Sequence, residues 1–217
     1  MPHERLSFFL LSLCLVLGLQ SVVLVSETAA QGRLVRLEGD GRLGPEADEY
    51  RGVSSAYGYE GTPHSVVPEM IELAAVNEDD VVYEPGCGDA RIVIAAVQAG
   101  ARRGLGVDIN ADLAELCYER VKAAKLEDKI EIYWGNALDL DMSEVTAVFL
   151  FMGNSFNMVM RPLLWEQLPV GARVVSNDFH MRDWAPDRTV RVETPDHTYV
   201  LYLWTITAQV KEKAQQN

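Results

Sequence analysis

The sequence predicts an α/β fold with a mostly parallel sheet that helices cover on both faces, and three observations favour it. From Thr62 onward, apolar runs of strand length alternate with segments that repeat apolar residues at helical spacing. The run VVYEP at 81–85 leads directly into two glycines, Gly86 and Gly88, a turn typical of a nucleotide-type pocket. Two apolar runs close the chain with no helix between them, which predicts an antiparallel hairpin at one edge of the sheet.

Each element is expected from its own pattern. In residues 65–76 the apolar positions fall on one helical face, Ser65 is the expected cap, and Pro68 lies in the first turn, where proline is tolerated. Asn110 is the expected cap of the next long helix, and Pro162 can start a second segment within a later one. The pattern predicts helices over 65–76, 89–100, 111–125 and 156–168, and strands over 80–85, 104–109, 129–134, 146–151, 172–178, 189–194 and 198–206.

The first thirty residues differ from the rest of the chain. Arg5 precedes an apolar stretch without a charge until Glu27, and residues 28–30 resemble a small-residue cleavage site. They predict an export signal, 1–30, and a periplasmic or secreted protein. Because the apolar stretch is long for a signal, an uncleaved membrane anchor through residues 6–26 is the alternative. The expected organisation continues with a linker over 31–61, one domain over 62–210 and a polar tail over 211–217.

Charge and cysteine content restrict the function classes. The 217 residues carry a net charge of −13, whereas a protein that holds nucleic acid by its backbone needs a basic face, so nucleic acid is not an expected partner. Of the three cysteines, Cys14 lies in the expected signal, Cys87 in the glycine turn and Cys117 on a predicted helix. This count predicts no disulfide framework, and the absence of a Cys-x-x-Cys pair with only four scattered histidines predicts no metal site.

The glycine turn indicates which ligand the pocket holds. A dinucleotide site needs a third glycine or alanine three residues after Gly88, and this chain has Arg91 there. The segment 84–88 matches instead the acid-x-Gly-x-Gly pattern of S-adenosylmethionine enzymes. The Glu84 carboxylate suits the positive methionine end of this ligand, directly or through water, and Asp108 can accept hydrogen bonds from both ribose hydroxyls. The sequence therefore predicts S-adenosyl-L-methionine as the cofactor.

Two further residues are candidates for the adenine end of the cofactor. Asn136 follows the third predicted strand, where a polar side chain can meet the adenine amino group, although asparagine is also a common turn residue. Ile109 follows Asp108 and lies either on the adenine face or in the core.

Five stretches of the chain resemble bacterial and archaeal relatives of a mitochondrial protein-lysine methyltransferase group: Thr62-Pro63 and residues 65–74, 81–96, 106–110 and 173–187. That group modifies ATP synthase subunit c and the adenine nucleotide translocase. The resemblance covers about residues 60–195 and implies a Rossmann-like class I methyltransferase fold with a seven-stranded sheet. It also implies a protein lysine as the methyl acceptor.

The chain departs from the usual pattern of this group at two places. The group usually has Asp-Leu-Gly-x-Gly-Asp-Gly-Arg, where this chain has Glu84, Pro85 and Ala90 in place of the aspartate, the leucine and the third glycine. Because the acid is kept one methylene longer, cofactor binding is expected to survive. The segment 152–156 differs from the usual leucine-rich stretch and borders the substrate in this fold, so the acceptor can differ too.

The residues expected on the acceptor side follow from the chemistry of methyl transfer. A lysine must lose its proton first, and an apolar aromatic channel lowers its pKa. Phe151, Phe156 and Phe179 fall at the ends of predicted strands and form either such a channel or part of the core. Asn154 and Asp178 are the candidate catalytic residues that orient the acceptor amine, although Asp178 can equally cap a turn. His180 is either a base near neutral pH or a solvated loop residue.

Four functions remain open from the residues. The first is an exported methyltransferase that acts on a protein lysine. The second keeps the fold and cofactor but methylates a small molecule or a lipid headgroup, which the altered segment 152–156 allows. The third is a non-catalytic domain that uses the old pocket for binding. The fourth, a nicotinamide oxidoreductase, is disfavoured by Arg91.

Overall fold

The computed structural model describes residues 34–51 and 59–214. The expected export signal over 1–30, with Cys14 and the apolar stretch 6–26, lies outside the described residues. Within the two described ranges, no helix is long and apolar enough to cross a membrane.

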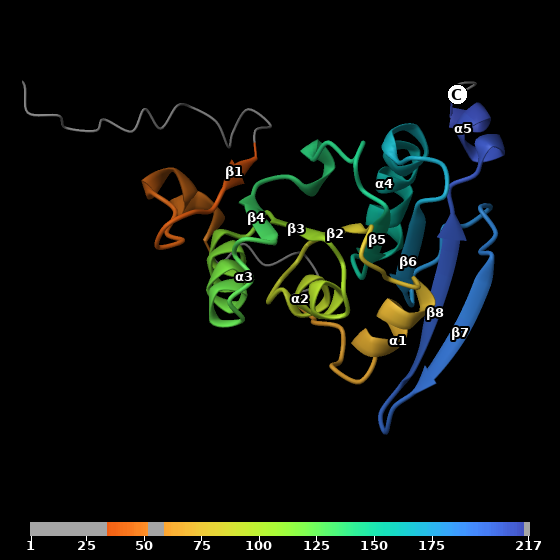
Figure 1. Ribbon diagram of the computed structural model, residues 1–217, viewed down its shortest axis with the longest axis horizontal. Helices are drawn as coiled ribbons and strands as arrows, with labels where there is room; N and C mark the ends of the chain where they lie inside the picture. The colour runs from red at the N-terminus through yellow and green to blue at the C-terminus, as the bar shows by residue number, and fades with distance from the viewer. Residues whose placement is uncertain (1–33, 52–58, 215–217) are drawn as a thin grey trace, which may run out of the picture.

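One eight-stranded sheet forms the centre of the fold, in the order β1-β4-β3-β2-β5-β6-β8-β7 (Figure 1). Neighbouring strands within the central five run parallel, and the two strands of the C-terminal hairpin run antiparallel on the β6 edge. The α/β class, the mostly parallel sheet and the closing hairpin are therefore confirmed. The strands are β1 (Val35–Arg36), β2 (Val81–Pro85), β3 (Arg103–Asp108), β4 (Ile130–Trp134), β5 (Ala147–Leu150), β6 (Arg173–Asn177), β7 (Arg188–Glu193) and β8 (Thr198–Thr205).

Helices cover both faces of this sheet, as Figure 1 shows. One face carries α1 (Val67–Leu73), α2 (Arg91–Gln98) and α3 (Ala111–Ala123), whose apolar sides share a core with alternate residues of the strands. The other face carries α4 (Asn154–Gln167) and α5 (Ala208–Ala214), which share a second core with the remaining strand residues. Every residue of the central strand β2 is buried, which explains why its sequence is a continuous apolar run interrupted only by the acid Glu84.

The sheet has one strand more than the seven expected, because β1 lies in the segment predicted to be a linker. β1 pairs antiparallel with β4, with Val35 opposite Trp134. The same segment contains the 3-10 helix η1 (Pro45–Tyr50), and Tyr50 packs edge-on against Trp134 with ring centroids 5.3 Å apart. Buried Glu115 of α3 accepts hydrogen bonds from the Leu43 amide and the Arg51 guanidinium. A strand of two residues shows no alternation, so the sequence could not predict it.

Two expectations about helix ends are wrong. Ser65 does not cap α1; the residue before the helix is Val66, and the amides of Val66 and Val67 donate to the Pro63 carbonyl instead. Pro162 does not start a second segment, because α4 runs through it as one helix. The missing proline N–H costs a hydrogen bond, and burial of Met160 and Leu164 on the same helix offsets that loss. By contrast, the Asn110 cap is confirmed, since its side chain accepts from two α3 amides.

The strand order fixes where a ligand can bind. From β2 the chain moves outward through β3 and β4 and then returns to the other side of β2 through β5 and β6. Open α/β sheets bind ligands outside the carboxyl ends of their strands at such a reversal. The carboxyl ends of β2, β3, β4, β5 and β6 form this edge, which we call the carboxyl edge.

Candidate active site

The turn after β2 has the backbone shape that the glycine pattern predicts. Gly86 and Gly88 have φ values of +65° and +55°, a region that favours glycine. The amides of Gly86 and Cys87 donate to the Val107 carbonyl over 2.7 and 3.1 Å. The turn is therefore folded against the end of β3, where Asp108 lies.

Asp108 joins three parts of the carboxyl edge. Its Oδ2 accepts from the Gly88 amide over 3.0 Å and its Oδ1 accepts from the Asn110 amide over 2.9 Å. Its main-chain carbonyl accepts from the Gly135 amide over 3.0 Å, which ties in the turn after β4. The side chain is only 6% exposed, and burial raises the pKa of this carboxyl above its usual range. A further acceptor position on these oxygens suits a hydroxyl donor such as a ribose.

Glu84 is buried and does not face solvent. Its Oε2 accepts from the Val93 amide over 2.9 Å, so the carboxylate caps the first turn of α2 from the neighbouring strand. The side chain is buried, and burial raises the pKa of Glu84 to about 8. A buried carboxyl of this kind gains from a nearby cation, which fits the positive methionine end of the expected cofactor.

The two residues predicted for the adenine end lie beside Asp108. Ile109 is 50% exposed, and its carbonyl accepts from the Trp134 indole over 3.0 Å. Asn136 caps the 3-10 helix η2 (Ala137–Asp139) through its side-chain oxygen, which accepts from the Leu138 amide over 3.0 Å. Asn136 thus has the turn role that was its alternative, and it is exposed at the end of β4.

The space above the two glycines tests whether the cofactor fits. A Cβ added at Gly86 would lie 2.1 Å from the Met152 sulfur, and one added at Gly88 would lie 2.3 Å from the Tyr59 ring. Met152 and Tyr59 are 37% and 48% exposed. The glycine turn is therefore covered by two exposed side chains rather than by backbone. Side chains of this kind can move aside, so the turn fits a ligand that approaches its backbone closely.

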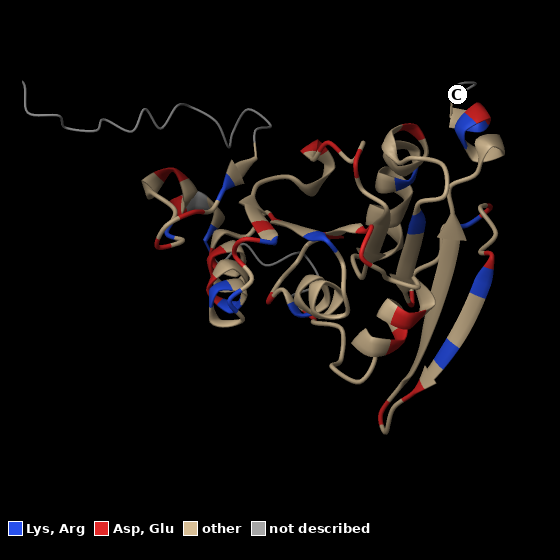
Figure 2. Cartoon of the chain, in the orientation of Figure 1, with Lys and Arg blue, Asp and Glu red and all other residues tan. Residues whose placement is uncertain are grey.

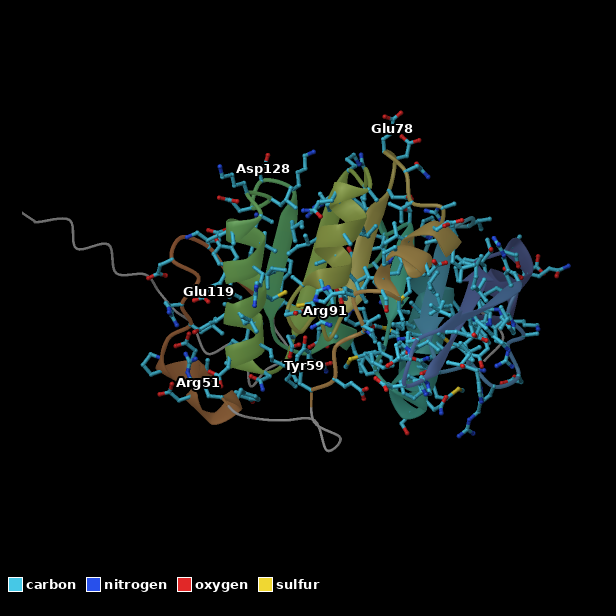
Figure 3. The ribbon with its side chains drawn as sticks, turned by 90° about the horizontal axis from the view of Figure 1, so that it is seen from below. Arg51, Tyr59, Glu78, Arg91, Glu119 and Asp128 are labelled. Atoms are coloured by element: carbon cyan, nitrogen blue, oxygen red, sulfur yellow. The ribbon has the colours of Figure 1, made fainter. Side chains whose placement is uncertain are left out.

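Arg91, which stands where a dinucleotide site would have glycine or alanine, has a structural role. It donates to both carboxylate oxygens of Asp89 over 2.7 Å and to the Thr62 carbonyl over 2.7 Å. Figure 3 shows Arg91 and Tyr59 close together in the middle of the molecule, and Tyr59 hydrogen-bonds to Asp89. This clamp holds the Thr62-Pro63 segment over the start of α2. Ala90, where the related group has glycine, has a φ of +65° and is buried.

The two predicted catalytic residues follow the neighbouring strands β5 and β6 at the carboxyl edge. Asn154 is the first residue of α4 and is exposed. Asp178 follows β6 with a φ of +59°, and its carboxylate accepts from the Val200 amide over 2.7 Å and contacts His197 Nε2 at 3.0 Å. Asp178 therefore ties the end of β6 to the start of β8, close to its alternative role as a turn residue. His180 accepts from the Arg182 amide through Nδ1.

Aromatic side chains do gather on the acceptor side. The rings of Phe151 and Phe179 stack with centroids 5.6 Å apart and an interplanar angle of 26°. They follow the neighbouring strands β5 and β6, as a channel at this edge requires. Phe156 instead packs against the core beneath α4.

The sequence did not predict two buried asparagines that lie near Phe179. Asn157 of α4 donates to the Ser176 hydroxyl over 3.1 Å and to the Phe179 carbonyl over 3.0 Å, which positions the Phe179 backbone. Asn177 ends β6, and the nitrogen and oxygen of its side-chain amide have no hydrogen-bond partner within the described ranges. A buried unpaired amide is costly unless water or a ligand satisfies it. The sequence signal that could have identified them is the presence of polar residues at core-facing positions, namely Asn157, Ser176 and Asn177.

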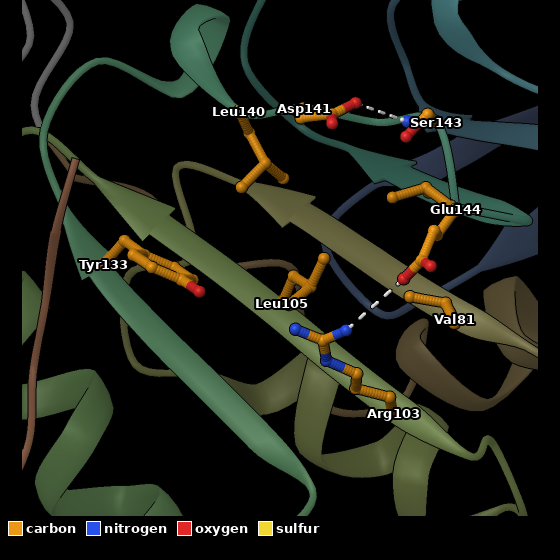
Figure 4. Close-up of a pocket in the computed structure, with 9 residues that line it drawn as sticks. Val81, Arg103, Leu105, Tyr133, Leu140, Asp141, Ser143 and Glu144 are labelled. Atoms are coloured by element: carbon orange, nitrogen blue, oxygen red, sulfur yellow. Dashed lines mark hydrogen bonds and ion pairs between the residues drawn. The ribbon is translucent and has the colours of Figure 1, made fainter. Parts of the chain in front are cut away.

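A separate hollow opens near the amino ends of β2 and β3, away from the carboxyl edge (Figure 4). Its volume is about 300 Å³, and Val81, Leu105 and Tyr133 form part of its wall. Arg103 lies in it with its charge already paired to Glu131 and, over 3.6 Å, to Glu144. Because this hollow shares no residue with the glycine turn, it is not the cofactor site.

Comparisons with known proteins agree with this geometry. Residues 84–188 match the family described as the ANTKMT methyltransferase domain. A protein-lysine N-methyltransferase of Saccharolobus islandicus (strain REY15A) is 36% identical over 149 residues, which cover 68% of this chain and 92% of that protein. The adenine nucleotide translocase lysine N-methyltransferase of Mus musculus is 32% identical over 101 residues, which cover 46% of this chain and 44% of that protein.

Solved structures add the cofactor class. An RNA methyltransferase from Salinibacter ruber, in complex with S-adenosyl-L-homocysteine, is 44% identical and matches 69% of this chain and 95% of its own, with a TM-score of 0.65. The m1A22 tRNA methyltransferase TrmK of B. subtilis has a TM-score of 0.60 at 16% identity and shares the fold alone. These findings confirm the resemblance to the protein-lysine methyltransferase group and the S-adenosylmethionine cofactor. The chain belongs to the family of the Saccharolobus protein-lysine N-methyltransferase, matches the ANTKMT methyltransferase domain over residues 84–188, and is an S-adenosylmethionine-dependent methyltransferase of the class I fold.

Proposed function

We propose that this enzyme transfers a methyl group to the side-chain amine of a protein lysine. The single observation that carries the proposal is the combination, at one edge of the sheet, of the Phe151–Phe179 stack with a cluster of carboxylates. The names of the Saccharolobus and mouse relatives support the same acceptor.

Three carboxylates lie close enough to Tyr199, near the start of β8, to act electrostatically on it. The pKa of Tyr199 is raised, first by burial and then by the negative charges of Glu60, Asp178 and Asp196. These acids come from the segment before α1, from the end of β6 and from the β7–β8 turn. Figure 2 shows acidic residues at the tip of this hairpin. Such a rim attracts a lysine ammonium ion and repels a phosphate.

For methyl transfer the protein must position the acceptor lysine and remove one proton from its ammonium group. S-adenosylmethionine, when bound, supplies a methyl group on a positively charged sulfur, which is already activated toward displacement. The lysine amine must arrive neutral, and the apolar Phe151 and Phe179 rings favour its neutral form by excluding water. The carboxylates of the acidic rim can accept the proton that leaves the lysine and pass it to solvent. In this scheme Asn157 is a positioning residue, because it holds the Phe179 backbone.

RNA is the second candidate acceptor, because the Salinibacter ruber protein is named an RNA methyltransferase at 44% identity. The charge of this chain argues against it. The net charge is −13, and Figure 2 shows Lys and Arg of the described residues spread over separate elements instead of along one face. A small-molecule or lipid-headgroup acceptor is the third possibility.

An acceptor assay with labelled methyl donor distinguishes these candidates. The full chain is incubated with isotope-labelled S-adenosylmethionine and an extract of its own organism, and samples are then digested with protease or ribonuclease or extracted with organic solvent. We expect label in protein and methylated lysine after acid hydrolysis. Label released by ribonuclease would replace the proposal with RNA methylation, and label in the solvent or small-molecule fraction would replace it with the third candidate. An Asp108→Ala variant, which should not bind the cofactor, is the control.

We further propose, from the sequence of residues 1–30, that the enzyme is exported and cleaved after Ala30. Sequencing of the mature N-terminus should start near Gln31. A start at Met1 or Pro2 would contradict cleavage and favour the alternative of an anchor through residues 6–26.

A further inference from the structure

Cys87 and Cys117 meet in the interior although thirty positions separate them. Their sulfur atoms lie 2.9 Å apart, and both side chains are buried as free thiols. Cys87 belongs to the cofactor turn between Gly86 and Gly88, and Cys117 belongs to α3. Neither residue has a role in the methyl transfer proposed above.

The local structure explains why the two sulfurs converge. The positive φ values at Gly86 and Gly88 reverse the chain around Cys87, whose side chain is buried in the core on the α1–α2–α3 face. Beneath it, β3 has Gly106, where an added Cβ would lie 3.0 Å from the Cys87 sulfur. Cys117 comes from the buried side of α3, which it shares with Ala114 and Val121. Thus Gly106 leaves the space in which the two thiols touch.

We propose that Cys87 and Cys117 form a disulfide bond that fastens the cofactor turn to α3. A disulfide has an S–S distance of about 2.05 Å, so the sulfurs need to approach by only about 0.9 Å from their present separation of 2.9 Å. A metal ion is the other common partner of paired cysteines, but it needs further ligands. The described residues contain no group of three or more His, Cys, Asp or Glu side chains that could hold one.

The oxidation balances with a small disulfide such as oxidised glutathione. The thiolate of one cysteine attacks a glutathione sulfur, which forms a mixed disulfide and releases one glutathione thiolate. The second cysteine then attacks the mixed disulfide, the Cys87–Cys117 bond forms, and a second glutathione leaves. The protein loses two protons and two electrons, and one glutathione disulfide becomes two thiols.

Burial controls when this exchange occurs. It raises the pKa of both thiols, of Cys87 well above its usual range, so few thiolates exist in the folded protein. Oxidation of the folded enzyme is therefore slow, and the bond forms while the chain folds.

The bond leaves the cofactor side of the turn free. Cys87 faces the core, whereas the Gly88 amide faces Asp108 over 3.0 Å. Cross-linking therefore fixes the turn in the arrangement that the cofactor needs, and it constrains a loop of about thirty residues in the unfolded chain. A loop of this length corresponds to a rise in Tm of roughly 5–15 °C for a protein of this size. This inference does not depend on which acceptor the enzyme methylates.

The test uses the full chain with Cys14→Ser, so that only the two paired cysteines remain. The protein is refolded in glutathione buffers of rising oxidised fraction, digested without reductant, and searched by mass spectrometry for a Cys87–Cys117 linked peptide. Tm is then measured for each sample with and without reductant. The single variants Cys87→Ser and Cys117→Ser are treated identically. Because each protein is compared with itself, a variant that is less stable in general does not obscure the result.

We expect a linked peptide, a Tm that reductant lowers by roughly 5–15 °C, and no effect of reductant on either single variant. S-adenosylmethionine affinity should be equal in the oxidised and reduced forms. Absence of the linked peptide at every glutathione ratio would overturn the proposal. So would a linked protein whose Tm is unchanged or lower, or one that no longer binds the cofactor.

Discussion

The Asp108 carboxylate accepts a hydrogen bond from the Gly88 amide over 3.0 Å, so the acid that ends β3 holds the glycine turn that follows β2. Twenty residues separate the two in sequence, yet the parallel pairing of β2 with β3 places both at the carboxyl edge. The cofactor site therefore depends on a contact between neighbouring strands as well as on the composition of the turn.

Replacing Asp108 with asparagine should weaken S-adenosylmethionine binding by at least about tenfold. The amide turns an N–H₂ group toward one of the two backbone donors, Gly88 or Asn110, and removes an acceptor for the ribose. Calorimetric titration measures the affinity. Asp128→Asn, at an exposed position on the opposite end of the strands, is the matched control and should bind normally. Equal affinity in the two variants would show that Asp108 does not contact the cofactor.

Glu84→Gln should gain stability relative to the parent enzyme as the pH rises. Burial raises the pKa of Glu84 to about 8 in the folded protein, above its ordinary value near 4.5. The folded state therefore holds this proton more tightly, and stability falls as pH rises from about 4.5 to about 8. Glutamine stays neutral and still accepts from the Val93 amide, so the difference should grow to the order of a few kcal/mol.

Chemical denaturation of both proteins without cofactor, from pH 5 to pH 9, measures this difference. Other titrating groups cancel because they are common to the two proteins. A difference that stays constant with pH would mean that Glu84 titrates normally. The same substitution should weaken S-adenosylmethionine binding, because the cationic end of the ligand loses its carboxylate.

Much of the fold could be predicted because it depends on local patterns. The alternation of apolar runs and helical faces identified β2 to β8 and α1 to α4, and Asn110 was recognised as a cap from its position alone. Strand β1 and helix α5 were not predicted. The first has only two residues, and the second is a short, mostly polar helix that buries only Val210.

The cofactor side of the site was easier to predict than the acceptor side for a physical reason. Glu84, Gly86, Gly88 and Asp108 belong to one continuous strand–turn–helix–strand segment, so their spacing carries the geometry. Acceptor-side contacts such as Asn157 with Phe179, or Asp178 with His197, join separate elements. The contact of Cys87 with Cys117 is of the same kind, which is why counting cysteines did not reveal it.

Gly86→Ala should impair both folding and cofactor binding, whereas Gly39→Ala should impair only folding. The two glycines have nearly equal φ values, +65° and +63°, so each alanine costs about 1–2 kcal/mol of backbone strain. A Cβ at Gly39 meets nothing within 4 Å, but at Gly86 it meets Met152 in the space expected for the ligand. Denaturation and calorimetry on both variants separate strain from site damage. Normal cofactor affinity in Gly86→Ala would contradict close approach of the ligand to this turn.

Asn157→Ala and Asn154→Ala should differ in stability. Asn157 is buried and donates to Ser176 and Phe179, so its loss should cost about 1–3 kcal/mol of unfolding free energy. Asn154 is exposed at the start of α4, so its replacement should change stability by less than about 0.5 kcal/mol. If Asn154 orients the acceptor, kcat should fall in a variant with normal Tm. An Asn154→Ala enzyme with unchanged kcat would remove this residue from the catalytic candidates.

Asp178→Asn should raise the KM for a lysine-containing substrate and leave kcat nearly unchanged. Asparagine keeps an acceptor for the Val200 amide and tolerates the φ of +59°, so the fold should persist. The substitution removes one negative charge from the rim that also contains Glu60 and Asp196, together with the ionic part of the contact between Asp178 and His197. We expect a rise in KM of roughly threefold to tenfold at low ionic strength, shrinking as salt screens the rim. Steady-state kinetics at two salt concentrations, with Asp128→Asn as the control for overall charge, provides the measurement. A fall in kcat with unchanged KM would instead assign Asp178 a direct role in the chemical step.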